Sequence, residues 1–78
     1  MRIQFYTRPN CSLCEDARLM LQLVSEEIDL EIQEINIENN DFVHEKYMIR
    51  IPVIEMDEIV IQEGRIDYPT LLEALTNE

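Results

Sequence analysis

The most informative stretch of the chain is RPNCSLC, residues 8–14, which holds the only two cysteines at Cys-x-x-Cys spacing. A short apolar strand pattern precedes this stretch, and an amphipathic helix pattern follows it. Two thiols at this spacing can be inert, can supply half of a metal site, or can cycle between a dithiol and a disulfide. The position between a strand and a helix favours the redox interpretation.

Periodic patterns extend from the cysteines in both directions. Residues 2–6 alternate like a short strand, and residues 12–24 have apolar side chains at helical spacing, with Leu13 on the apolar face. Ser12 and Glu15 have the spacing of a capping box. We therefore expect the helix to begin within the Cys-x-x-Cys segment.

A second strand and a second helix are predicted in the middle of the chain. Residues 30–37 form the strand, and the phase of their alternation changes between Ile32 and Ile35, which predicts a bulge or a twist there. Residues 41–48 form a short helix that the preceding Asn residues can cap.

A hairpin and a final helix complete the predicted elements. Residues 51–54 and 59–61 form strands joined across residues 56–58. This turn lacks the Gly that tight hairpins favour, so it is expected to be strained or wider than two residues. Asp67 and Pro69 open the last helix.

The predicted order is βαβαββα in a single domain over residues 1–78. A strand–helix–strand start predicts a parallel pair with a right-handed crossover. The closing hairpin adds antiparallel strands to the same sheet. The fold class is therefore α/β, with a four-stranded mixed sheet flanked by helices on both faces.

Composition argues against several functional classes. Six basic residues against 17 acidic ones, a net charge of −11, do not suit the phosphate backbone of nucleic acid. No apolar run approaches ~18 residues, so we expect no membrane span, and the N-terminus lacks the apolar stretch of a signal peptide. We expect a cytoplasmic protein, where structural disulfides are rare. Two cysteines and one histidine cannot complete a tetrahedral zinc site in one chain, although a dimer could, so no metal is expected.

The chemistry of the cysteine pair follows from its place at a helix start. The positive end of the helix dipole and the unpaired N–H groups stabilise a thiolate at Cys11, and Arg8 adds positive charge. Glu15 and Asp16 oppose that thiolate, and we expect the balance to lower the pKa of Cys11. Cys11 is then the attacking residue, and Cys14, one turn deeper, resolves the mixed disulfide.

Pro52 opens the third predicted strand and can approach the cysteines from the facing loop. A cis peptide at this position would expose the backbone of Ile51 for pairing with an extended substrate chain.

Two segments carry a resemblance to a known family. Residues 6–14 closely resemble the active-site segment of glutaredoxins, and residues 50–54 resemble their cis-proline segment. The similarity runs over essentially the whole chain and is strongest to small bacterial glutaredoxin-like proteins of the thioredoxin superfamily. It implies a thioredoxin-like fold, with Cys11 as nucleophile, Cys14 as resolving residue and Pro52 in cis.

The chain also departs from the glutaredoxin pattern. Glutaredoxins usually place Pro-Tyr between the cysteines, Thr-Val ahead of the cis-proline and Gly-Gly before the last helix, whereas residues 12–13, 50–51 and 63–65 are Ser-Leu, Arg-Ile and Glu-Gly-Arg. Arg8 matches the basic residue that meets a glutathione carboxylate in the family, and the resemblance puts a substrate carboxylate near Asp67. The redox role is therefore better supported than the glutathione role.

Basic and aromatic residues complete the expected substrate site. Arg8, Arg50 and Arg65 are expected near the cysteine face, where they would attract a carboxylate-bearing substrate. Tyr6 either lines this site or packs in the core at the end of its strand.

The sequence therefore predicts a dithiol–disulfide oxidoreductase that reduces protein disulfides or glutathione mixed disulfides. We expect a monomer with no tightly bound cofactor, glutathione as a co-substrate, and recharging by glutathione or a thioredoxin reductase. Two alternatives stay open. Two chains could hold an iron–sulfur cluster through Cys11, or the domain could be a redox-inactive adaptor.

Overall fold

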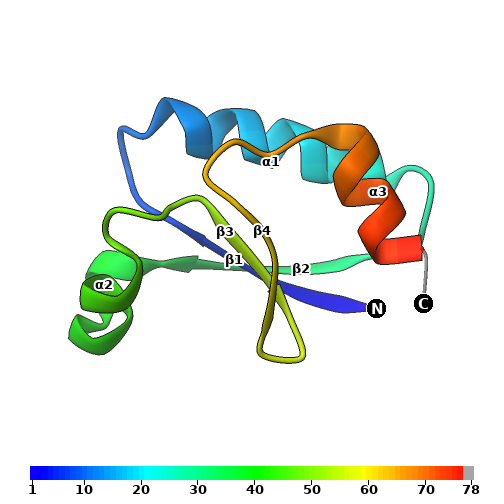
Figure 1. Ribbon diagram of the computed structural model, residues 1–78. Helices are drawn as coiled ribbons and strands as arrows, with labels where there is room; N and C mark the ends of the chain where they lie inside the picture. The colour runs from blue at the N-terminus through cyan, green and yellow to red at the C-terminus, as the bar shows by residue number, and fades with distance from the viewer. Residues whose placement is uncertain (77–78) are drawn as a thin grey trace.

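The computed structural model describes residues 1–76. Its elements confirm the predicted βαβαββα order and add one 3-10 turn, η1, ahead of the second helix (Figure 1). In chain order they are β1 (Arg2–Thr7), α1 (Ser12–Ser25), β2 (Glu31–Asn36), η1 (Ile37–Asn39), α2 (Asp41–Tyr47), β3 (Val53–Met56), β4 (Ile59–Glu63) and α3 (Tyr68–Thr76).

The four strands form one mixed sheet in the order β2-β1-β3-β4. β1 is parallel to β2 and antiparallel to β3, and β3 and β4 form an antiparallel hairpin. In Figure 1, α1 and α3 cover one face of this sheet, while α2 lies at one end of the opposite face. The predicted α/β class is therefore confirmed. Within residues 1–76, no helix has the length and apolarity needed to cross a bilayer.

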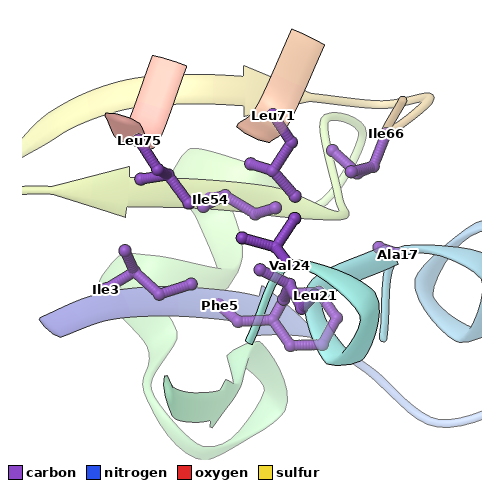
Figure 2. Close-up of a cluster of buried hydrophobic side chains, with 9 residues drawn as sticks. All are labelled: Ile3, Phe5, Ala17, Leu21, Val24, Ile54, Ile66, Leu71 and Leu75. Carbon is purple, nitrogen blue, oxygen red and sulfur yellow. The ribbon is translucent and has the colours of Figure 1, made fainter. Parts of the chain in front are cut away.

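The main core lies between the sheet and the two helices α1 and α3. Figure 2 shows side chains from β1, α1, β3, α3 and the segment before α3 converging there. All are buried: Ile3, Phe5, Ala17, Leu21, Val24, Ile54, Ile66, Leu71 and Leu75. Burial of each large aliphatic side chain contributes about 1.5–3 kcal/mol, which makes this layer the main source of stability.

Leu13 does not join this core, which corrects the prediction that it lies on the buried face of its helix. The Leu13 side chain is 39% exposed, whereas that of Cys14 is 1% exposed. In the first turn of α1 it is therefore the second cysteine that faces the sheet.

A smaller cluster lies between the sheet and α2. Its buried members are Ile37, Tyr47 and Val53, and Tyr6, Val43 and Ile51 pack against them. Because α2 has only seven residues, this cluster covers only part of the sheet face.

The predicted bulge in the second strand is wrong. β1 and β2 pair in continuous register, with Ile32 opposite Ile3 and Ile35 opposite Tyr6. Ile32 and Ile35 are three residues apart and therefore lie on opposite faces of an unbroken strand. The register shift occurs in the hairpin instead, between Ile54 and Glu55.

The hairpin turn is tight, and its backbone is strained. Met56 pairs with Ile59, so Asp57 and Glu58 alone form the turn. Both have positive φ, 54° and 66°, which is the conformation of a type I′ turn. Residues with a side chain adopt this left-handed region at a cost, so of the two predicted outcomes the structure has the strained one.

Candidate active site

Cys11 is the N-cap of α1. Its backbone is extended, with φ −120° and ψ 106°, and its Sγ accepts a hydrogen bond from the backbone N–H of Cys14 at 3.2 Å. Its carbonyl accepts the N–H of Glu15 at 3.1 Å. The sulfur thus takes the place that a Ser, Thr or Asp oxygen usually has at a helix start. The predicted capping box at Ser12 is therefore wrong by one residue, and Ser12 is the first residue of the helix.

The two cysteines form a disulfide, with their Cα atoms 5.2 Å apart. This separation lies within the range of ordinary disulfides. Cys11 is half-buried, whereas Cys14 is enclosed by α1 and the sheet. An incoming molecule can therefore reach the first sulfur much more easily than the second.

One of the two carboxylates next to the cysteines is held in an ion pair. Glu15 forms an ion pair with Arg18 at 2.8 Å, and Arg18 also pairs with Glu34 at 2.6 Å. These hydrogen bonds, first to Glu34 and then to Glu15, raise the pKa of Arg18, which keeps its charge permanently. Asp16 and Arg8 are both exposed. The opposition that Glu15 would offer to a Cys11 thiolate is reduced accordingly.

The proline segment and the cysteine segment lie at the same end of the sheet (Figure 1). Val53 pairs with Tyr6, and the same register places Pro52 opposite Thr7, which leads directly into the cysteine loop. The Ile51–Pro52 peptide is cis, and Pro52 is buried.

The backbone of Ile51 is only partly free for a substrate. Its N–H donates to the carbonyl of Tyr47 at 3.1 Å, in the turn that follows α2. The expectation that an extended substrate pairs with the Ile51 backbone is therefore wrong for the N–H group and stays a prediction for the carbonyl.

Arg50 and Arg65, both expected near the cysteines, have different surroundings. Arg50 forms an ion pair with Glu63 at 2.6 Å, so its charge is compensated within the chain. Arg65 is exposed and follows Gly64, whose N–H donates to the carbonyl of Pro52 at 2.8 Å. This bond ties the segment before α3 to the proline segment.

Two other predicted substrate residues have structural partners. The hydroxyl of Tyr6 donates to Glu55 at 3.4 Å, and its ring centroid lies 4.9 Å from that of Tyr47. Tyr6 therefore faces the α2 side of the sheet, whereas the cysteine pair opens α1 on the other side. Asp67 caps α3, because its Oδ2 accepts the N–H of Thr70 at 2.9 Å. These bonds to Thr70 lower the pKa of Asp67.

Two residues with a part in this geometry were missed from the sequence. Arg18 is one, although its i,i+3 spacing from Glu15 was a readable signal. Glu55 is the other, a carboxylate within the apolar strand pattern after Pro52. In the part of the chain that the structure describes, no three His, Cys, Asp or Glu side chains form a group that could hold a metal ion.

Known proteins share both the sequence and the fold. The family model described as "Glutaredoxin-like domain (DUF836)" matches residues 2–76. A "Glutaredoxin-like protein YDR286C homolog" from Dictyostelium discoideum is 34% identical over 77 residues, which cover 91% of this chain and 71% of the relative.

Solved structures show the same arrangement at lower identity. Protein XcR50 from X. campestris has a TM-score of 0.81 at 22% identity, covering 94% of this chain and 93% of that one. Thioredoxin 1 from Thermosipho africanus has a TM-score of 0.68 at 16% identity, covering 96% and 90%. The fold is therefore thioredoxin-like, and the family match and the Dictyostelium relative establish that the chain belongs to the glutaredoxin-like domain family.

Proposed function

We propose that this protein is a dithiol–disulfide oxidoreductase. The observation that carries the proposal is the asymmetry of the cysteine pair: Cys11 is reachable and caps a helix, and Cys14 lies behind it at bridging distance. An inert pair would not need one sulfur at the surface and the other beneath it.

The reaction transfers two electrons from the pair to a substrate disulfide. The Cys11 thiolate attacks one sulfur of the substrate, forms a mixed disulfide and releases the other substrate sulfur as a thiolate, which takes up a proton. Cys14 then loses its proton to solvent and attacks the Cys11 sulfur. This step releases the second substrate thiolate and leaves the Cys11–Cys14 disulfide.

The start of α1 would activate Cys11 as a nucleophile by stabilising its thiolate. A free cysteine has a pKa near ~8.5 and is mostly protonated at neutral pH. In the reduced protein, the N–H of Cys14 and the positive end of the α1 dipole would stabilise the Cys11 thiolate. The ion pair between Glu15 and Arg18 removes part of the opposing charge. We therefore expect the pKa of Cys11 to be lowered.

The proposed substrates are protein disulfides and glutathione mixed disulfides, and glutathione or a thioredoxin reductase would recharge the pair. Arg8 is exposed beside the cysteines and is the basic residue best placed to meet a substrate carboxylate. The partly exposed Leu13 between the cysteines offers apolar contact to a polypeptide. No tightly bound cofactor enters these steps, and the reducing cytoplasm is the compartment proposed for them.

Two single variants test the proposal by trapping the intermediate. Reduced Cys14→Ser is expected to form a stable mixed disulfide with oxidised glutathione and with disulfide-bonded insulin, measured as a mass increase that a reductant reverses. Reduced Cys11→Ser is expected to form neither adduct, because its remaining sulfur is enclosed. Ser25→Ala, at the far end of α1, is the control: it keeps both cysteines, undergoes the same reduction and purification, and is expected to behave like the unaltered protein.

The same variants identify the outcomes that contradict the proposal. Equal adduct formation by both cysteine variants would reject the division of roles. An absence of adducts in Cys14→Ser would reject the redox function and favour an adaptor. Alkylation of Cys11 by iodoacetamide in the Cys14→Ser variant, followed across pH, tests the activation, and a midpoint above that of free cysteine would reject it.

A further inference from the structure

The sheet face opposite α1 and α3 holds a cavity that the redox site does not use. Its volume is about 460 Å³, which lies within the ~300–1,000 Å³ range of small-ligand pockets. Its lining residues come from β1, α2, β3 and the turn between β3 and β4. It exists because α2 covers only one end of this face.

The floor of the cavity is a buried carboxylate. Glu55 lies on β3, between two other strands, and is only 7% exposed. The hydroxyls of Tyr6 and Tyr47 each donate to one of its two oxygens. Burial, and after it the interactions with Glu55, raises the pKa of both tyrosines, so that both stay neutral donors.

Glu55 has no counter-ion in the described chain. Among residues 1–76, the ion pairs of the arginines are with other carboxylates, and no Lys or Arg nitrogen lies within 4.0 Å of Glu55. Buried charges in proteins are normally paired, because hydrogen bonds from neutral groups offset only part of the hydration free energy that a charge loses on burial. Each carboxylate oxygen of Glu55 has two acceptor positions and uses one, so each oxygen can accept a further hydrogen bond.

The rest of the cavity is also suited to a cation. The rings of Tyr6, Tyr47 and the 75% exposed Phe42 line it, together with Asp57 and Glu58 of the strained hairpin turn. Aromatic faces combined with carboxylates attract ammonium and guanidinium groups.

The chain's own cations already show this attraction. The Lys46 Nζ and the Arg50 Cζ each lie 5.0 Å from the centre of the Tyr47 ring. The cavity is lined by three carboxylates and two basic residues, and one of the latter, Arg2, is paired with Glu31. Among the described residues that line the cavity, Lys46 is therefore the cation that would compete with a ligand.

We propose that this cavity binds an organic cation, a primary ammonium or guanidinium group on a short carbon chain, with Glu55 as its counter-ion. The ligand is either a free amine or the side chain of a lysine or arginine in another polypeptide. The site is on the opposite face of the sheet from α1 and is independent of the thiol chemistry proposed above.

The test is a titration of the full chain followed by ¹H–¹⁵N NMR. The probes are agmatine and putrescine as free amines, a capped Gly-Lys-Gly peptide as the polypeptide source, and 1-butanol as an uncharged control. Saturable shifts centred on Tyr6, Phe42 and Tyr47 are expected with the cations and not with butanol. Tighter binding of the peptide than of the free amines would identify a polypeptide side chain as the source, and the reverse would identify a free amine.

Matched variants separate the site from general attraction to an acidic protein. Glu55→Gln is expected to weaken binding by about tenfold or more, because it removes the counter-ion. Glu73→Gln makes the same change of charge on an exposed turn of α3 and is expected to leave the affinity within about twofold. Lys46→Gln is expected to tighten binding, because it removes the competing cation.

A second carboxylate of the cavity, Glu58, provides a substitute variant. If Glu55→Gln does not fold, the exposed Glu58→Gln takes its place, with a smaller loss of affinity expected. Unsaturable shifts spread over both faces, or equal losses in the cavity variant and Glu73→Gln, would overturn the site. Cys11→Ser is expected to bind the probes like the unaltered protein, so a failure of the redox proposal would leave this result unchanged.

Discussion

Replacement of Tyr47 by Phe isolates the hydrogen bond that joins α2 to the buried carboxylate of β3. The substitution keeps the ring in the smaller cluster and removes only the hydroxyl that donates to Glu55. Glu55 would then keep one long hydrogen bond, 3.4 Å from Tyr6. A hydrogen bond to a charged group contributes about 1.5–3 kcal/mol to stability. For a chain of this size, each kcal/mol lowers Tm by roughly 4–8 °C.

Tyr47→Phe is therefore expected to lower Tm by about 6–24 °C, measured by circular dichroism at pH 7 on the oxidised protein. Tyr68→Phe is the matched control: Tyr68 is half-buried against the main core, and within residues 1–76 its hydroxyl has no hydrogen bond partner. A loss in Tyr47→Phe no larger than in Tyr68→Phe would refute the reasoning.

Alkaline pH provides a second test of the same contact. Because the folded protein raises the pKa of Tyr47 above its ordinary value of 10.0, the folded state retains a proton that the unfolded state releases. The stability of the unaltered protein therefore falls as pH rises above about 10 towards the folded pKa. Tyr47→Phe removes this contribution, so its stability should fall less steeply over that range. Equal slopes in the two proteins would contradict the assignment.

Other predictions concern the helix cap, a turn and the core. The folded protein lowers the pKa of Asp67 below its ordinary value of 3.8, so this helix cap contributes its full stability at pH values above 3.8. That contribution is lost as the pH falls through the folded pKa. The difference in Tm between the unaltered protein and Asp67→Ala should therefore shrink in acid. Gly64 has φ +76°, and among residues 1–76 no atom other than those of Gly64 and its two chain neighbours lies within 4 Å of the position that a Cβ would take. Gly64→Ala should therefore cost about 1–2 kcal/mol through backbone conformation alone, measured by urea unfolding. Leu71→Ala should cost about 2–5 kcal/mol by the same assay, because it opens a cavity in the main core, whereas the partly exposed Leu13→Ala should stay within about 0.5 kcal/mol. Similar losses in the two leucine variants would contradict the assigned core.

Local patterns predicted most of the elements correctly. The helix caps at Asn40 and Asp67 and the start of α1 beside the cysteines all depend on residues within a few positions of one another. Such signals are readable without coordinates because capping and turn geometry are short-range. The strand–helix–strand order and the closing hairpin then predicted the mixed sheet, and the family resemblance implied the same fold.

Two of the errors share one physical cause. The predicted bulge at Ile32–Ile35 and the buried position of Leu13 both depended on what lies opposite each residue. The partner of Arg50 is 13 residues away, and that of Tyr6 is 49 residues away. Alternation along a strand cannot indicate which neighbour completes a contact.

The Cys-x-x-Cys spacing and the adjacent strand and helix patterns were enough to predict two sulfurs one helical turn apart at a helix start. The folded structure was needed to show that Cys14 is enclosed while Cys11 stays reachable. The same is true of Glu55, which lies on a half-covered sheet face with no counter-ion among residues 1–76. Both outcomes depend on which elements cover each face of the sheet, and that coverage arises from packing between segments far apart in the chain.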